Sequence, residues 1–528
     1  MERNVTAGPD LQHETTPATS QGGVLPPREL RIVIAGLLIA LLLSALDNTI
    51  VATAMPTIVG KLGGFAKYTW VTTAYVVTST IATLMLGKLS DLYGRRWVFL
   101  LAIILFLVGS LLCGAAQTMN QLIVFRALQG LGGGGIWGLT FAVVGDLVPP
   151  VDRGRYFGLF TGVFAIASVA GPLVGGVIVD HFSWRWIFYV NLPIGLVAFA
   201  VVAKVLRLPF QRRDPQLDLV GAVLLCGGIA ALMVALEEGS LKGWGSPWII
   251  VLFAATLALL VAFVAQERRT PEPILPMRLF SNDILRNTML IGFVLGVTMM
   301  TAGLFFALYF QDVLFRTPTK AGLMTMPIML GVLVASTTTG RLISSSGTYR
   351  RFPLIGIPVA LAGLALATRT TSTSPYLVLA LAMLLIGLGV GTTMPTLSIA
   401  GQNVAEPQDL GISTASLNFF RSLGSSIGLA VYGTVFNSTV RHGLTGRLPS
   451  GTNRGDILDI IREPKKLQAL PLAVRSAVTS SIGEGVARVF TYGLIVTAFA
   501  LLFAVRLREA PLRKTSGMQQ QRAALVEP

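Results

Sequence analysis

The chain has 528 residues, of which 53% are hydrophobic and only 12% charged, and its formal net charge is +16. Soluble domains carry roughly 25% charged residues, so this composition excludes a water-soluble globular protein and a disordered chain. Cys113 and Cys226 both lie inside apolar runs, which excludes a disulfide scaffold. The three histidines are scattered, so we expect no metal and no other cofactor.

Apolar runs of about 20 residues, the length that crosses a bilayer as a helix, recur from Ile32 onward. We therefore predict an all-α polytopic membrane protein with 14 transmembrane helices. Residues 1–30 are polar and are expected to form a disordered cytoplasmic tail. The expected spans are residues 31–54, 68–87, 97–117, 120–145, 156–180, 184–206, 217–236, 247–266, 288–311, 321–343, 352–369, 376–399, 411–435 and 486–506.

The basic residues predict the orientation of these spans. With the N-terminus inside, the inner segments hold 24 of the 41 Lys and Arg residues, and the short outer loops hold 7. The segment 436–485 holds another 7, and the spans hold three. This asymmetry follows the positive-inside rule, and it explains the net charge without a nucleic-acid partner. Both termini, including the tail 507–528, are therefore expected in the cytoplasm of a cell-membrane protein.

A short internal repeat predicts two halves. Residues 87–96 read GKLSDLYGRR and residues 340–351 read GRLISSSGTYRR, each after the second span of a six-span unit. Parallel six-span repeats are a known transporter architecture. We expect an N-terminal six-helix bundle (31–206), a linker with two extra helices (207–287) and a C-terminal six-helix bundle (288–506). Residues 436–485 are expected to form a long extracytoplasmic loop.

Two charged residues lie deep in apolar spans of the N-terminal half. Asp47 is fifteen residues past Ile32, or about 22 Å along a helix. A carboxylate at that depth is costly, so it should face a cavity or a partner. Arg126 needs an acidic or carbonyl partner, and Asp47 is a candidate. The pair is expected to bind protons or a cationic substrate, with a purely structural role as the alternative; Asp312 is the second candidate proton carrier.

Other residues are candidates for conformational or substrate-binding roles. Asp91 is hard to explain by topology, since acids contribute little to orientation, and it suggests a charge latch with the basic residues that follow. The glycines of span five suggest close helix packing, and Pro172 favours a bend. Aromatic and polar side chains in other spans either line a substrate cavity or simply pack. These cavity candidates are Tyr75, Phe306, Tyr309, Gln311, Asn418 and Arg421.

Four motifs resemble the major facilitator superfamily, in its fourteen-span drug:proton antiporter branch. They are LDNTIV at 46–51 with Met55-Pro56, GKLSDLYGRR at 87–96, RALQG at 126–130 and GPLVGG at 171–176. The resemblance implies that Asp47 and Arg126 couple transport to protons. It also implies a conformational latch made by Gly87, Asp91, Gly94, Arg95 and Arg96, and an antiporter helix marked by Gly171, Pro172, Gly175 and Gly176. Ser344 stands where a second latch would need an acid, so no second latch is expected.

These observations predict a secondary transporter rather than an enzyme. No Gly-x-x-x-x-Gly-Lys-Ser/Thr loop occurs, so ATP hydrolysis is not expected. The leading hypothesis is a monomeric, proton-coupled exporter of hydrophobic drugs or toxic compounds, cationic ones among them, that works by alternating access. Its expected partners are the small-molecule substrate, protons and the lipid bilayer. Export of an endogenous metabolite, lipid or siderophore is the first alternative, and import of a nutrient is the second.

Overall fold

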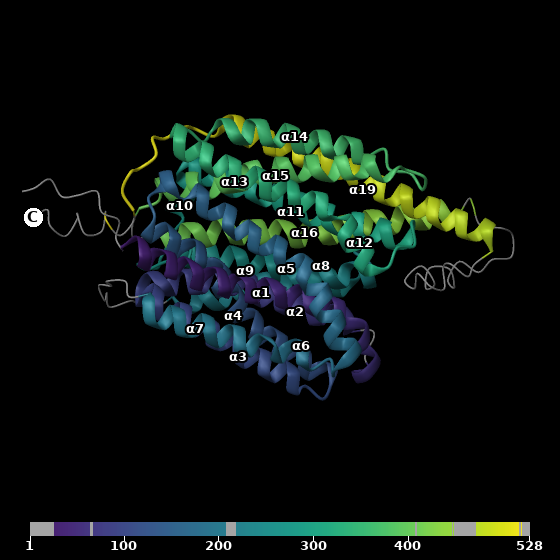
Figure 1. Ribbon diagram of the computed structural model, residues 1–528, viewed down its shortest axis with the longest axis horizontal. Coiled ribbons are helices and arrows are strands. Elements are labelled where there is room, and N and C mark those ends of the chain that lie inside the picture. Colours follow the sequence, from purple (N-terminus) through teal and green to yellow (C-terminus); the bar gives the residue numbers. More distant parts are fainter. Residues whose placement is uncertain are drawn as a thin grey trace, which may run out of the picture.

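The computed structural model describes residues 26–63, 67–206, 218–406, 409–445, 447, 471–516 and 519. Within these ranges the regular structure is helical, without β-strands (Figure 1). The first nine α-helices are α1 (Pro27–Leu62), α2 (Tyr68–Tyr93), α3 (Arg95–Ala115), α4 (Met119–Leu147), α5 (Gly154–His181), α6 (Trp186–Tyr189), α7 (Asn191–Val205), α8 (Leu219–Lys242) and α9 (Pro247–Glu267). The others are α10 (Arg278–Ser281), α11 (Asp283–Asp312), α12 (Pro318–Met324), α13 (Met326–Ser346), α14 (Arg351–Ala367), α15 (Tyr376–Val404), α16 (Leu410–Thr445) and α19 (Leu472–Arg506).

The number of membrane spans is supported in part. Twelve helices in the described ranges are long and apolar enough to cross a membrane. α14 has only 17 residues, and α16 carries Asn418 and Arg421 among its apolar residues, so neither is among the twelve. The predicted total of fourteen is therefore not confirmed. The predicted tail 1–30 lies outside the described residues up to position 25.

The helices pack as two groups with two further helices between them in the chain. α1–α5 and α7 pack on one another, and α11 packs with α15, α16 and α19. In Figure 1 the first group lies in the lower half and the second group in the upper half. The groups meet mainly where α2 and α4 contact α16 and where α5 contacts α13. α8 and α9 pair with each other, and α8 also contacts α2 and α16.

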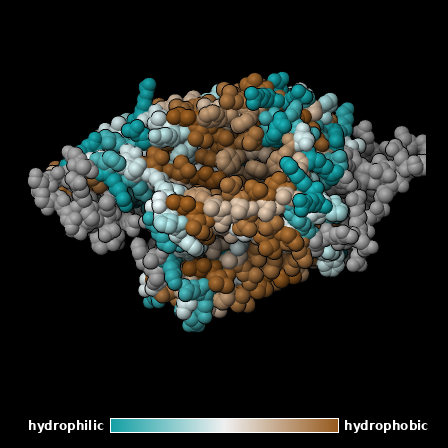
Figure 2. Space-filling view, turned by 180° about the vertical axis from the view of Figure 1, so that it is seen from behind, coloured by the Kyte–Doolittle hydropathy of each residue, from teal (hydrophilic) through white to brown (hydrophobic). Residues whose placement is uncertain are grey.

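The surface is divided into bands. Figure 2 shows a broad hydrophobic band across the middle of the molecule, with hydrophilic residues gathered towards both ends of the helices. Large apolar side chains such as Val124, Leu173 and Leu257 are more than half exposed in the structure. Exposed apolar area on this scale is what lipid tails cover in a membrane protein.

The predicted loop at 436–485 is largely replaced by helix in its described parts. α16 continues to Thr445 and α19 begins at Leu472. Val440 and Leu444 on α16 are buried in the same apolar cluster as Val478 and Ile482 on α19. This mutual burial extends both helices beyond the predicted span ends. Residues 448–470 lie outside the described part of the chain.

Glycines bring the two groups of helices together at the end that contains the α2–α3 turn, which we call the latch end. Gly94 forms that turn with a φ of 91°, a conformation that residues with a Cβ rarely adopt. A Cβ on Gly154 of α5 would collide with the backbone of Gly340 on α13, and the reverse also holds. The two helices therefore touch backbone to backbone at this end.

We expect Gly340→Ala to destabilise this arrangement, because overpacking a close contact costs about 1–3 kcal/mol. The measurement is the thermal unfolding midpoint of the purified protein in detergent. Gly303→Ala is the matched control, since a Cβ there meets no protein atom within 4 Å. Equal losses of stability in the two variants would contradict the close contact between α5 and α13.

Candidate functional site

A buried ion pair joins α1 and α4. Nη1 of Arg126 lies 2.6 Å from Oδ2 of Asp47, and the two side chains are 1% and 0% exposed. Nε2 of Gln129 donates to Oδ1 of Asp47 at 2.9 Å, and Nδ2 of Asn191 donates to the same oxygen at 2.7 Å. Arg126 also donates to Oε1 of Gln129 at 2.8 Å. The carboxylate thus has three side-chain donors in a place closed to solvent.

The surroundings of this pair are partly polar. The Arg126 guanidinium lies 4.2 Å from the centre of the Tyr75 ring, a cation–π contact. The Tyr75 hydroxyl lies 3.1 Å from Oγ of Ser44, one turn before Asp47 on α1. Nε of Arg126 and Oδ1 of Asn191 are buried without a hydrogen-bond partner among the described residues. The site therefore retains one free donor and one free acceptor beside the ion pair.

The glycines predicted to mark an antiporter helix pack α5 against α1 just beyond Asp47. A Cβ on Gly171 would collide with the Thr49 side chain, and one on Gly175 would lie 3.3 Å from the carbonyl oxygen of Ile50. Oγ1 of Thr49 donates to the carbonyl of Ala167 at 3.0 Å. These glycines hold α5 close to the helix that carries the buried carboxylate. Gly176 faces away from these contacts, and Pro172 lies inside the helix.

The residues predicted to form a latch meet at the latch end. Nη1 of Arg95 lies 2.5 Å from Oδ1 of Asp91, and its Nε donates to Oδ2 of Asp146 at 2.7 Å. The backbone N–H of Ile412, in the first turn of α16, donates to Oδ2 of Asp91 at 3.0 Å. A carboxylate at a helix N-terminus is favourable, because the free N–H groups and the helix dipole attract it. Asp91 therefore links the two groups of helices, while Arg96 binds the carbonyl of Ala203 within the first.

Small residues allow this contact. A Cβ on Gly87 would lie 2.6 Å from the Cβ of Ala415, and one on Gly411 would collide with the Asp91 carboxylate. Of the predicted latch residues, Gly87, Asp91 and Arg95 lie against α16, and Gly94 shapes the turn. Arg95 also holds the Asp91 carboxylate in place. Among the described residues, Ser344 donates to the carbonyl of Gly340 on its own helix.

A second polar link between the groups was not predicted from the sequence. Arg153, which is 1% exposed, donates through Nη1 to Oε1 of Gln402 on α15 at 2.9 Å. Gln402 in turn donates to the carbonyl of Phe141 at 3.2 Å and to Oγ1 of Thr414 at 3.0 Å. In the sequence, the positive-inside rule was enough to explain Arg153 as one of several basic loop residues. The uncharged Gln402 carried no signal that it would bind an arginine.

The predicted substrate-cavity residues are dispersed. Phe306 packs on Phe490 with ring centres 4.6 Å apart, and the Tyr309 hydroxyl donates to the carbonyl of Thr371; both side chains are fully buried in an apolar core. Tyr75 belongs to the Asp47 network. In the described conformation Phe306 and Tyr309 therefore pack, which is the alternative that the sequence left open, and their place in a substrate cavity stays a prediction.

The remaining cavity candidates also separate. Asn418 donates to the carbonyl of Thr414 one turn earlier on α16, and Gln311 lies partly buried near the end of α11. Asp312, the second candidate proton carrier, follows Gln311 at the other end of α11 from the latch end. Arg421 lines a small cavity formed with Gly292, Met394, Leu397, Ser398 and Leu417.

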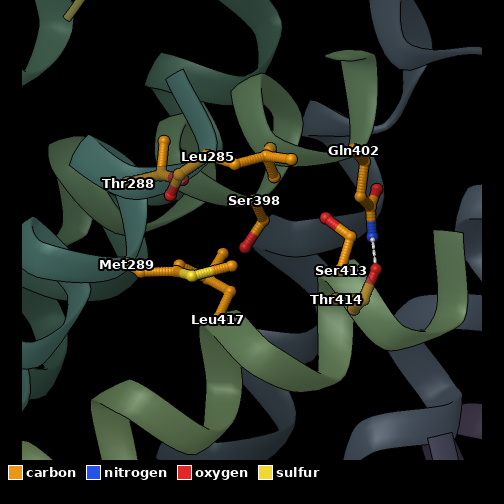
Figure 3. Close-up of a pocket in the computed structure, with 9 residues that line it drawn as sticks. Leu285, Thr288, Met289, Ser398, Gln402, Ser413, Thr414 and Leu417 are labelled. Carbon is orange, nitrogen blue, oxygen red and sulfur yellow. Dashed lines mark hydrogen bonds between the residues drawn. The ribbon is translucent and has the colours of Figure 1, made fainter. Parts of the chain in front are cut away.

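Figure 3 shows a second pocket of this kind where α11, α15 and α16 meet, which in the described conformation is too narrow to hold a water molecule. Its walls combine the apolar side chains of Leu285, Met289 and Leu417 with hydroxyl and amide groups. Both cavities share Ser398 and Leu417, so they lie next to each other. The described residues include no group of three or more His, Cys, Asp or Glu side chains that could hold a metal ion.

Sequence reasoning also missed several members of the Asp47 and Asp91 networks. Gln129 follows Arg126 by three residues in the RALQG motif, and that spacing on a helix places both side chains on one face. Asn191 and Asp146 lie far from their partners in the chain. Their recruitment depends on how α7 and α4 pack against neighbouring helices, which no local pattern reveals.

Two helix groups, an ion pair buried between helices of one group, and polar links closing one end between the groups are the features of a membrane transporter. The sequence model of the Major Facilitator Superfamily matches residues 37–429. The chain belongs to this family. It is therefore a multi-span membrane protein that transports small molecules, and the family is not an enzyme family.

Similar proteins agree with this assignment. The chain is 35% identical to Multidrug resistance protein 3 of Bacillus subtilis (strain 168) over 501 residues, which cover 93% of this chain and 98% of that protein. It is also 35% identical to Multidrug transporter protein MdtP of the same organism, over 93% of this chain and 95% of that protein. The crystal structure of the human organic anion transporter MFSD10 (TETRAN) superposes with a TM-score of 0.62 at 16% identity. That superposition covers 91% of this chain and 100% of the other, and it shows the shared fold.

We expect Asp47→Asn to lower the free energy of unfolding by about 3–5 kcal/mol, because it leaves the buried Arg126 charge uncompensated. The double variant Asp47→Asn/Arg126→Gln should recover much of this loss. The measurement is denaturant-induced unfolding in detergent micelles. Asp283→Asn is the control, since its partly exposed pair with Arg286 should contribute little. A double variant less stable than Asp47→Asn would contradict mutual charge compensation.

Asp91→Ala should slow transport roughly tenfold and leave substrate affinity within about twofold. A hydrogen bond to a charged group contributes about 1.5–3 kcal/mol, and here it biases the conformation without touching a ligand. The comparison is turnover against equilibrium binding of one substrate in the same preparation. Asp152→Ala, which removes only an exposed carboxylate 3.5 Å from Arg155, is the control. Unchanged turnover in Asp91→Ala would contradict the latch.

Proposed function

We propose that this protein is a proton-coupled exporter of hydrophobic drugs or other toxic compounds that works by alternating access. The observation that carries the proposal is the buried Asp47–Arg126 pair, with its two side-chain amide donors, inside an apolar bundle. The efflux part rests on relatives named as multidrug proteins, which match more than nine-tenths of the chain. The proposal includes the fourteen-span drug:proton antiporter branch and the domain limits expected from the sequence.

Proton coupling follows from the electrostatics of the pair. A neighbouring guanidinium favours the ionised carboxylate, and burial without it favours the protonated form. A rearrangement that separates Arg126 from Asp47 would therefore let Asp47 take up a proton, and the return movement would expel it. The free donor on Arg126 and the free acceptor on Asn191 give both groups room to exchange partners.

The alternating movement involves the contacts at the latch end. With both termini in the cytoplasm, that end faces the cytoplasm, and the described conformation is closed there by the Asp91–Ile412 and Arg153–Gln402 hydrogen bonds. Opening towards the cytoplasm requires these bonds to break and α5 to move away from α13. The protein would work as a monomer, because both groups of helices belong to one chain.

The coupling is tested by substrate-induced proton release from the purified protein as a function of pH. We expect Arg126→Ala to shift the release to higher pH, because the unpaired, buried carboxylate holds its proton longer. Asp47→Asn should abolish the release, and Arg126→Lys should restore it in part, because a point charge replaces a planar fork. The double variant Asp47→Asn/Arg126→Ala should behave like Asp47→Asn alone. Additive effects in the double variant would show that the residues act independently.

Export itself is tested by dye accumulation in cells with and without a protonophore. Lower accumulation in expressing cells that disappears with the protonophore supports proton-driven efflux. Export of an endogenous metabolite, lipid or siderophore would leave dye accumulation unchanged, and import of a nutrient would raise the uptake of that nutrient instead.

A further inference from the structure

Arg421 is a charged residue in the second group of helices, and the mechanism proposed above assigns it no role. It lies eleven residues into α16, or about 16 Å from the latch end, roughly half of a hydrocarbon core of about 30 Å. Its side chain is only partly buried and lines the cavity between α11, α15 and α16. In the described part of the chain, the guanidinium forms no hydrogen bond or ion pair.

The helices around the cavity provide no nearby acid. α15 contains no charged residue at all. On α11 the acids are Asp283, nine residues before Gly292 of the cavity wall, and Asp312, twenty residues after it. These separations correspond to about 14 Å and about 30 Å along the helix. Asp283 is also already paired with Arg286.

Asp47, the deep acid of α1 in the opposite group of helices, is not available to Arg421 either. Asp47 is fully buried and already paired with Arg126. The two halves therefore differ in charge: the deep charges of the first are balanced, and Arg421 in the second is not. An unpaired guanidinium inside a membrane protein is costly and needs an anionic or strongly polar partner.

The walls of the cavity indicate the chemistry of that partner. Met394, Leu397 and Leu417 are apolar, whereas Ser398 supplies a hydroxyl. The adjoining cavity in Figure 3 adds Ser413, Thr414 and the Gln402 amide towards the latch end. In the described conformation the cavity beside Arg421 measures only about 10 Å³, so a ligand could enter only after the helices move apart. A guanidinium with hydroxyls and an apolar wall would then suit a small amphipathic anion, with its carboxylate or phenolate on Arg421 and its apolar body along the Leu and Met side chains.

We propose that Arg421 is the binding residue for an anionic group on the transported compound, so that this protein accepts hydrophobic organic anions. This inference rests on the proposed function, because it names the substrate class of the same exporter. It departs from the expectation of cationic substrates, which requires a free carboxylate in the transport path.

Binding to the full-length protein in detergent tests the inference with three fluorescent probes. Anthracenecarboxylate is anionic, anthracenemethanol has the same rings without the charge, and ethidium is cationic. We expect the wild type to bind the carboxylate at least tenfold more tightly than the alcohol. Arg421→Gln should abolish this preference and strengthen ethidium binding, whereas Arg421→Lys should keep part of the preference because it keeps the charge.

Arg488→Gln is the matched control, because Arg488 is an exposed arginine on α19, away from the cavity, and its loss should leave all three affinities unchanged. A wild type that binds the acid and the alcohol equally would overturn the inference, as would a preference that survives in Arg421→Gln. The Arg421→Lys variant keeps the test decisive if Arg421→Gln does not fold.

Transport separates this inference from the proposed function. In proteoliposomes with an imposed pH gradient, the wild type should move anthracenecarboxylate against its own gradient. One outcome is that binding selects the anion through Arg421 but the pH gradient moves no substrate. That outcome would support the anion site and refute proton-coupled export. The other outcome is that the pH gradient moves ethidium equally in the wild type and in Arg421→Gln, and that neither protein prefers the anion. That outcome would refute the anion site and support proton-coupled export.

Discussion

The structure depends on one constraint: a carboxylate and a guanidinium lie inside an apolar helix bundle, where neither is stable alone. Asp47 and Arg126 meet this constraint by pairing at 2.6 Å, and Gln129 and Asn191 supply further hydrogen bonds to the carboxylate. The pair links α1 to α4, and Asn191 adds α7. Next to this pair, glycines such as Gly171 bring α5 close to α1, the helix that carries Asp47.

At the latch end, close contacts between helices and polar contacts between side chains and backbone also occur together. Here the charges lie between the two groups of helices, so each bond must be able to break during transport. Asp91 contacts the N-terminus of α16 because Gly411 leaves space for its carboxylate, and Gly154 meets Gly340 backbone to backbone. A small number of hydrogen bonds and close glycine contacts hold this end closed, and the alternating access that we propose would require them to break.

The two groups of helices balance their deep charges differently. In the first group, cation and anion compensate each other within the bundle. In the second, Arg421 lines a cavity without a described partner. In the antiporter that we propose, this asymmetry would separate two tasks. The proton site must hold its own counter-charge to switch affinity, whereas a substrate site gains selectivity when the ligand brings the counter-charge.

The sequence by itself determined the membrane class, nearly all helical segments and the residues Asp47, Arg126 and Asp91, because hydropathy and buried charge are local properties that the chain displays directly. Only the tertiary structure decided the partners. Asn191 binds Asp47 although 144 positions separate them in the sequence, and Gln402 binds Arg153 although 249 positions separate them. No local sequence pattern predicts either contact. The tertiary structure also showed Phe306 and Tyr309 packed in an apolar core, one of the two alternatives that the sequence left open, and it showed helix at both ends of segment 436–485. Such outcomes depend on which helix faces meet, and that is settled by packing between distant segments rather than by local composition.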